Sequence, residues 1–141
     1  MNSDPIHDGA DQFFQWMAID PVTGAIYVQF YDRRSDPADR KTAVTLARST
    51  DGGHTFTNYA WTSTGFEGHD VRLGDYMWLT AYDNRVYGAW AEPVRADSVL
   101  AASAGDTSQR SVRASASHGR GAGAAAYVPI IRVGTADFST H

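Results

Sequence analysis

The sequence predicts an all-β fold built from short antiparallel strands. Apolar and polar residues alternate with a period of two over much of residues 13–92, and helical periodicity is weak there. Turn-forming Gly, Pro, Asp and Asn interrupt the alternation at short intervals, as the connections of an antiparallel sheet require. A strand–turn–strand pattern also occurs twice in this region, which indicates a repeat architecture.

The first unit consists of four expected strands at 13–20, 25–32, 42–48 and 55–62. The first turn begins with Pro-Val-Thr-Gly, in which proline presets φ and glycine tolerates a positive φ. A loop rich in charge and proline separates the second strand from the third, and Asp-Gly-Gly marks the third turn. Four strands joined in this order form a meander of the length of one β-propeller blade.

A second, partial blade is expected from residue 77 onward. Segments 77–82 and 85–92 form a strand–turn–strand unit that repeats 16–20 and 25–30 of the first blade. Residues 1–92 are therefore assigned to about one and a half blades. All four tryptophans and six of the seven tyrosines lie in this part of the chain.

The rest of the chain divides into two segments. Residues 93–126 are dominated by Ala, Ser, Gly and Arg and hold few large apolar side chains, a composition that predicts disorder. Residues 127–141 contain a last expected strand, Tyr127–Phe138. The sequence thus predicts a β body, a disordered segment near the C-terminus and a terminal strand.

Composition narrows the classes of function. Residues 1–92 carry 13 acidic and 7 basic side chains, and residues 93–141 carry 3 and 5, which sum to the net charge of −4. An acidic body argues against a nucleic-acid partner. The chain has no cysteine, so disulfides and thiolate zinc sites are excluded, and no apolar run reaches the length of a membrane span. The polar first ten residues lack a signal region, so the localisation of the chain itself stays undetermined.

The most specific motif spans residues 49–56, Ser-Thr-Asp-Gly-Gly-His-Thr-Phe, and has the form of an Asp box. The expected Asp-box residues are Ser49, Asp51, Gly53, Thr55 and Phe56. The aspartate is expected to accept backbone N–H bonds in the turn, and the glycine permits a conformation that a Cβ would hinder. The phenylalanine is expected to fold back and plug the hairpin. The motif is therefore structural and not catalytic.

Through this motif the chain resembles the sialidase-like (BNR-repeat, Asp-box) glycosyl hydrolase families. The segments 16–24, 28–34, 74–76 and 86–90 extend the resemblance. It implies a closed propeller with more blades than this chain supplies, so the chain is interpreted as a C-terminal fragment. It also implies that the parent protein is secreted or on the cell surface.

The resemblance also implies site residues. In sialidases, arginines bind the substrate carboxylate, a tyrosine paired with a glutamate acts as nucleophile, and no cofactor is required. Arg33 and Arg34, at a strand end, are the candidate substrate-binding residues, and Tyr76 and Glu67 are the candidate catalytic residues. The alternative for the arginines is an ion pair with a nearby aspartate, and the alternative for Tyr76 is packing between blades.

Asp32, Asp36 and Asp39 of the charged loop offer oxygen ligands of the kind that calcium prefers. Their spacing is not that of an EF-hand, so a solvated loop is the expectation and no metal is assigned. The five histidines show no i, i+4 pair, which argues against zinc.

Two functions from different classes follow. The parent is a glycoside hydrolase, or it is a non-catalytic Asp-box propeller that serves as a binding or scaffold module. A propeller pocket is lined by every blade, so one and a half blades are expected to be inactive alone. The expected partners are a glycan or glycoconjugate and the missing blades, with no nucleic acid and no membrane.

Overall fold

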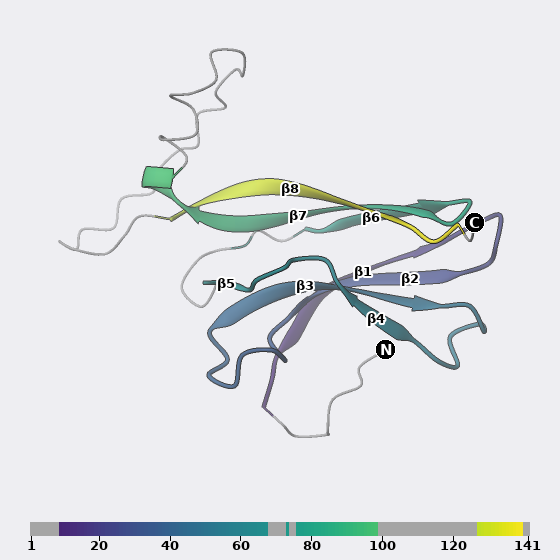
Figure 1. Ribbon diagram of the computed structural model, residues 1–141, viewed down its shortest axis with the longest axis horizontal. Coiled ribbons are helices and arrows are strands. Elements are labelled where there is room, and N and C mark those ends of the chain that lie inside the picture. Colours follow the sequence, from purple (N-terminus) through teal and green to yellow (C-terminus); the bar gives the residue numbers. More distant parts are fainter. Residues whose placement is uncertain (1–8, 68–72, 74–75, 99–126, 140–141) are drawn as a thin grey trace, which may run out of the picture.

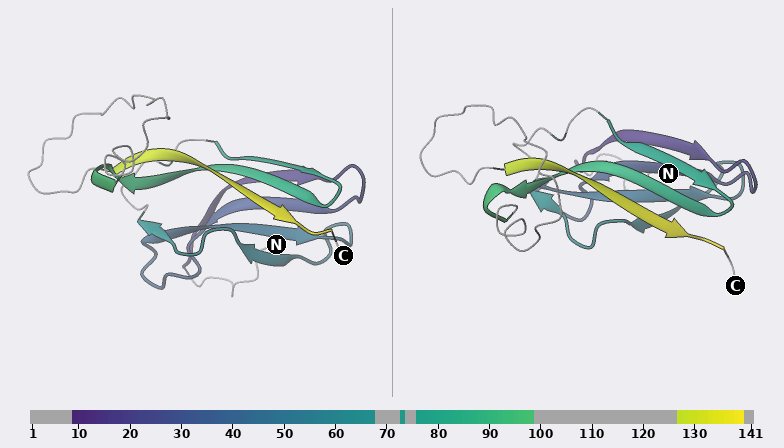
Figure 2. Two further views of the ribbon diagram at one scale, coloured as in Figure 1. Left: turned by 45° about the horizontal axis from the view of Figure 1, so that its top comes forward. Right: turned by 90° about the horizontal axis from the view of Figure 1, so that it is seen from above.

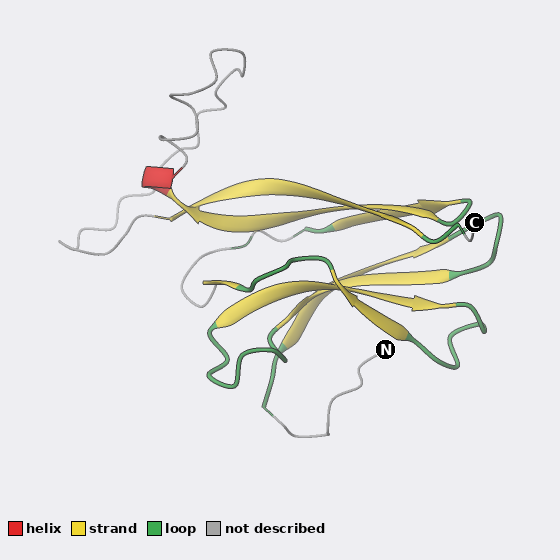
Figure 3. Ribbon diagram, viewed as in Figure 1, coloured by secondary structure: helices red, strands yellow, loops and turns green. Residues whose placement is uncertain are grey.

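The computed structural model describes residues 9–67, 73, 76–98 and 127–139, and it confirms an all-β fold of antiparallel strands. Within this part of the chain, α-helical residues occur only at 96–98 (Figure 3). The strands are β1 (Gln12–Ile19), β2 (Ile26–Asp32), β3 (Lys41–Ser49), β4 (Thr57–Ala60), β5 (Phe66–Glu67), β6 (Trp78–Tyr82), β7 (Arg85–Arg95) and β8 (Tyr127–Asp137).

The strands form two sheets that pack face to face (Figures 1 and 2). The first sheet has the order β1-β2-β3-β4, with β5 also paired to β3. The second sheet has the order β6-β7-β8, so its last strand comes from the far end of the chain. All pairings are antiparallel, and the first four strands follow one another as the predicted meander.

Some boundaries differ from the sequence prediction. The fourth expected strand, 55–62, is shorter, and pairing with β3 resumes later at β5. Strand β7 continues to Arg95, although disorder was expected from Pro93 onward. The reason is its partner, because β8 pairs with β7 along its whole length. Pro93 lies opposite Pro129, and neither residue has an N–H to donate. Residues 99–126, the rest of that expected segment, lie outside the described residues.

The main core lies between the two sheets. Tyr27 and Leu46 of the first sheet pack with Leu79, Ala81 and Val86 of the second, and all five are buried. Alternation explains this arrangement, because every second side chain of a strand points to the same face. A second cluster extends the interface and contains Tyr31, Val44, Leu73, Met77 and Trp90.

Buried hydrogen bonds also join the sheets. The Tyr31 hydroxyl donates to the Ala91 carbonyl at 2.7 Å and accepts from the Ala91 N–H at 3.2 Å. Burial raises the pKa of Tyr31 to about 12, so this hydroxyl keeps its proton. The Gln29 side-chain amide donates to the Ala89 carbonyl at 3.2 Å. Two side chains of β2 therefore bind the backbone of β7 directly.

The carboxylate of Asp20 connects the first turns of the two repeats. It accepts N–H bonds from Val22 (2.9 Å) in its own turn and from Asp83 (3.0 Å) and Asn84 (2.7 Å) in the turn between β6 and β7. Burial alone would raise the pKa of Asp20, but the backbone N–H bonds outweigh it and lower the pKa to about 2. The ionised carboxylate therefore holds the two sheets together at this end.

Candidate functional site

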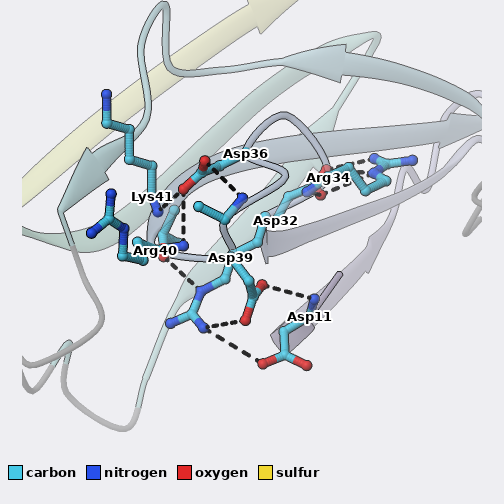
Figure 4. Close-up of polar contacts among 10 residues, drawn as sticks. Asp11, Asp32, Arg34, Asp36, Asp39, Arg40 and Lys41 are labelled. Carbon is cyan, nitrogen blue, oxygen red and sulfur yellow. Dashed lines mark hydrogen bonds and ion pairs between the residues drawn. The ribbon is translucent and has the colours of Figure 1, made fainter. Parts of the chain in front are cut away.

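Arg34, a predicted substrate-binding residue, is paired with Asp32 at the end of β2 (Figure 4). Its Nε lies 2.9 Å from both Asp32 carboxylate oxygens, and its guanidinium lies over the Phe30 ring at 5.7 Å. The Thr45 hydroxyl also donates to Asp32, at 2.6 Å. Burial would raise the pKa of Asp32, but the bonds from Arg34 and Thr45 lower it. The Arg34 guanidinium thus has its carboxylate partner within the chain.

Arg33, the other predicted substrate-binding residue, is also engaged. Its Nη1 lies 3.2 Å from Asp39 and 3.5 Å from Asp11, and its Nε donates to the Thr42 hydroxyl at 3.2 Å. The guanidinium stacks over Phe13 with 5.1 Å to the ring centroid. The side chain is mostly buried, so it braces the loop against β1 and β3.

The third acidic residue of this loop, Asp36, binds backbone rather than an arginine. It accepts N–H bonds from Lys41 (2.7 Å), Arg40 (2.9 Å) and Ala38 (3.2 Å), and the first two chiefly lower its pKa (Figure 4). Asp32, Asp36 and Asp39 therefore each bind a different partner. Across residues 9–67, 73, 76–98 and 127–139, no three acidic or histidine side chains form a group that could hold a metal ion.

The predicted catalytic pair is not brought together. Tyr76 lies just before β6 and exposes 82% of its surface. Glu67 is exposed on β5, where its backbone pairs with Lys41. Within the described part of the chain, no hydrogen bond joins the two side chains, and the exposure of Tyr76 also differs from the packing role considered for it.

The Asp box closes the hairpin between β3 and β4. The Ser49 hydroxyl donates to Asp51 Oδ1 at 2.7 Å and accepts the Gly53 N–H at 2.9 Å. Asp51 accepts the Thr55 hydroxyl at 2.5 Å and the Thr55 N–H at 2.9 Å, and these two bonds chiefly lower its pKa. The motif is thus a local network in which Ser49 shares the role expected of Asp51.

The remaining Asp-box residues fit the same structural role. Gly53 has a φ of +92°, a conformation that side chains disfavour. Phe56 is half-buried and packs on the cluster of Val28, Phe30 and Ala47, on the face of the first sheet that points away from the second. The expected plug is therefore present, at the outer face of the sheet.

Sequence reasoning missed an interruption between β4 and β5. Ala60 pairs with Thr45, and Phe66 pairs with Thr42. The β4–β5 segment therefore advances by six residues while its partner β3 advances by three. The Trp61 N–H donates to the Val44 carbonyl at 2.8 Å, and the Val44 N–H donates to the Thr62 hydroxyl at 3.0 Å. The extra residues form a bulge at 61–65, a feature that re-aims side chains.

The bulge sends the Trp61 side chain onto the second sheet. Its ring stacks on Trp90 with centroids 5.7 Å apart and an interplanar angle of 23°. Two glycines paired across β7 and β8 make room for these rings. A Cβ at Gly88 would clash with the Trp61 ring and with Gln29 Oε1, and one at Gly134 would lie 2.8 Å from Trp90. A glycine inside a strand often marks such a close approach. Gly88 is therefore the residue from which the sequence could have predicted this contact.

A cleft of about 470 Å³ opens beside this tryptophan pair, between the bulge and the second sheet. An ion pair lies at its wall, with 3.4 Å between Arg132 Nε and Glu92 Oε2. The lining residues are Trp61, Thr62, Ser63, Thr64, Trp90, Glu92, Arg132, Val133, Gly134 and Thr135. The cleft combines aromatic surface, hydroxyl groups and one paired acid and base, as small-molecule sites do.

No family model matches this chain, and searches of curated proteins and of solved structures gave no match either. Among the described residues, none of the helical segments has the length and apolar character that a membrane span requires. The assignment of function therefore depends on the geometry above and on the motif in the sequence.

Proposed function

We propose that this chain forms neighbouring blades of a sialidase-like Asp-box propeller, in which it supports glycan recognition and does not supply the catalytic groups. The observation that carries the proposal is the Asp box itself. Ser49, Asp51 and Thr55 form its hydrogen-bond network in the turn between the third and fourth strands of a four-stranded meander. This is the position at which an Asp box stabilises a propeller blade.

The packing of the two repeats also supports the proposal. The repeat-related Trp16 and Trp78 have ring centroids 5.2 Å apart, and the first turn of one repeat binds that of the other through Asp20. Each sheet packs one apolar face against the other sheet, as neighbouring blades of a propeller do. A repeat unit that buries its face on the next copy is typical of such architectures.

The arginine pairs favour a supporting role over catalysis. Arg33 and Arg34 both direct guanidinium N–H groups to carboxylates of the chain itself, which leaves fewer donors for a substrate carboxylate. Within the described part of the chain, no hydrogen bond joins Tyr76 to Glu67, as would be needed to activate a tyrosine nucleophile. The binding or scaffold alternative is therefore the better description of what this chain contributes.

Hydrolysis of a fluorogenic sialoside and of aryl glycosides tests the catalytic part of this proposal. We expect no turnover by the purified chain. Turnover that disappears in Tyr76→Phe but persists in Tyr87→Phe, a matched change at another exposed tyrosine, would overturn it. The architectural part is tested by a crystal structure of the protein as isolated from its natural source. Blades around a central channel are expected there, and a two-sheet sandwich without a ring would contradict the proposal.

A further inference from the structure

We propose that the cleft between the Trp61–Gly65 bulge and the second sheet binds a neutral sugar. The choice of a carbohydrate rests on the proposed function, whereas the cleft and its lining are features of the structure. The site lies between the sheets and uses none of the candidate catalytic and substrate-binding residues that the sialidase resemblance implies.

The bulge supplies a row of hydroxyl groups. Thr62, Ser63 and Thr64 are consecutive and all line the cleft, because the chain leaves the ladder between Ala60 and Phe66. The Thr62 hydroxyl already accepts the Val44 N–H at 3.0 Å, so its own proton remains to be donated. Hydroxyl groups that both donate and accept match the hydroxyl groups of a sugar.

The tryptophan pair supplies the aromatic surface. Trp61 is half-buried and lines the cleft with Trp90, and the apolar C–H face of a pyranose packs well on an indole ring. Three buried polar atoms around this pair lack a hydrogen-bond partner within the described part of the chain: Gln29 Oε1, Trp61 Nε1 and Trp90 Nε1. The two indole nitrogens belong to rings that line the cleft, so the polar edges of these rings are not used by other side chains of the described residues.

The charge of the cleft selects for a neutral ligand. Glu92 and Arg132 are the charged residues that line it, and they neutralise each other across 3.4 Å. A sugar carboxylate would gain no net attraction there and would compete with Glu92 for Arg132. Vicinal hydroxyl groups can instead donate to the carboxylate and accept from the guanidinium without breaking the pair.

The size of the cleft limits the ligand. A volume of about 470 Å³ falls within the range of small-molecule sites, roughly 300–1,000 Å³. One or two sugar residues fit this space, and a longer glycan would extend into solvent. The ligand class is therefore a neutral monosaccharide or disaccharide, or the neutral end of a longer glycan.

Titration of the full chain with lactose and with cellobiose tests the proposal. Binding is monitored by tryptophan fluorescence and by calorimetry. Saturable, weak binding of at least one disaccharide is expected, with a change in fluorescence because Trp61 lines the site. N-acetylneuraminic acid is expected to bind more weakly than that disaccharide. Equal or tighter binding of the acid would contradict the argument from charge.

Two matched variants locate the site. Arg132 and Arg85 both lie on the β7–β8 ladder, expose about half or more of their side chains (50% and 64%), and pair with an acid on the neighbouring strand. Arg132→Gln is expected to weaken binding about tenfold, the effect of losing a hydrogen bond to a charged group, and Arg85→Gln is expected to leave it unchanged. Ser63→Ala is expected to weaken binding by a smaller factor.

Equal affinity of wild type and Arg132→Gln, or no binding of either disaccharide, would overturn the proposal. That result would leave the blade assignment intact, because the assignment depends on the Asp box and on the packing of the repeats. Conversely, glycoside hydrolysis that requires Tyr76 would refute the supporting role and leave the cleft untouched. The two failures are therefore distinguishable.

Discussion

The two sheets differ in how much of their outer faces is buried. The first sheet buries its inner face against the second sheet and also buries Val28, Phe30 and Ala47 on its outer face, although Met17 and Ile19 of its edge strand β1 are exposed. The second sheet buries its inner face but little of its outer face. Among its described residues, the following large apolar side chains are exposed: Trp78, Tyr82, Tyr87, Tyr127, Ile131 and Val133.

The difference shows that the segments that connect the strands determine how much of the outer face of a sheet is covered. The first sheet obtains its outer cover from its own connections, since Phe56 folds back from the Asp box and Arg34 lies over Phe30. In the second sheet, the two-residue turn Asp83–Asn84 that joins β6 and β7 is too short to provide such a cover. Exposed apolar surface of this kind marks a site of association, which agrees with the proposal that further blades pack here.

The largest expected effect follows from truncating the shared inner face. Leu46 is completely buried between the sheets, so Leu46→Ala should lower the free energy of unfolding by about 2–5 kcal/mol. Val133→Ala, on the exposed face, should change it by less than about 0.5 kcal/mol. Urea unfolding followed by circular dichroism measures both. Similar losses for the two variants would show that the faces do not differ as described.

The next effect concerns the hydrogen bonds between the sheets. Tyr31→Phe removes the hydroxyl that bonds to both backbone groups of Ala91, and leaves these groups buried. A loss of about 1–3 kcal/mol in the free energy of unfolding is expected. Tyr87→Phe, on the exposed face of the second sheet, serves as control and should be close to neutral. A neutral Tyr31→Phe variant would mean that these bonds do not hold the sheets together.

The pH dependence of stability tests the role of the ionised Asp20 carboxylate. Its pKa in the folded state is about 2, below the ordinary value of 3.8, so its stabilising contribution is present above about pH 4 and is lost as the pH falls toward 2. Asp20→Asn should therefore melt below the wild type at pH 7, and the difference in Tm should shrink between pH 4 and pH 2.

Thermal melts of both proteins from pH 7 to pH 2 measure this difference. The comparison with Asp20→Asn matters because the pKa values of Asp32, Asp36 and Asp51 are also lowered, and these groups destabilise both proteins in acid. Asp137→Asn, at an exposed ion pair of the second sheet, is the matched control and should show only a small difference in Tm. A difference for Asp20→Asn that stays constant with pH would contradict the role of the ionised carboxylate.

The smallest effect on stability, and the clearest on association, is expected at the exposed face of the second sheet. Ile131 and Val133 expose 72% and 71% of their surface. Ile131→Ser combined with Val133→Ser should hardly change the melting temperature but should raise the fraction of monomer. Light scattering after size-exclusion chromatography measures the mass. If the wild type is already a monomer at high concentration, the exposed face does not mediate association.

Local sequence patterns were sufficient to predict most strands, the turns and the Asp box. Alternation places β2 and β3, and Pro21–Gly24 and Asp51–Gly53 form turns because proline, glycine and aspartate act through their own backbone or near neighbours. The repeat also predicted the hairpin of β6 and β7. These features depend on contacts between residues that are close in the chain, so a local pattern suffices to predict them.

The partners of the side chains, in contrast, depend on tertiary packing and could not be predicted from local patterns. The ion pairs of Arg33 and Arg34, the bonds from Asp20 to the second repeat and the stacking of Trp61 on Trp90 all depend on how the chain folds back on itself. The same holds for β8, whose pairing extends β7 to Arg95 although the local composition predicted disorder. The local sequence around an arginine, a tryptophan or a glycine does not show whether the residue has a structural or a ligand-binding role. That role depends on contacts with residues from other strands.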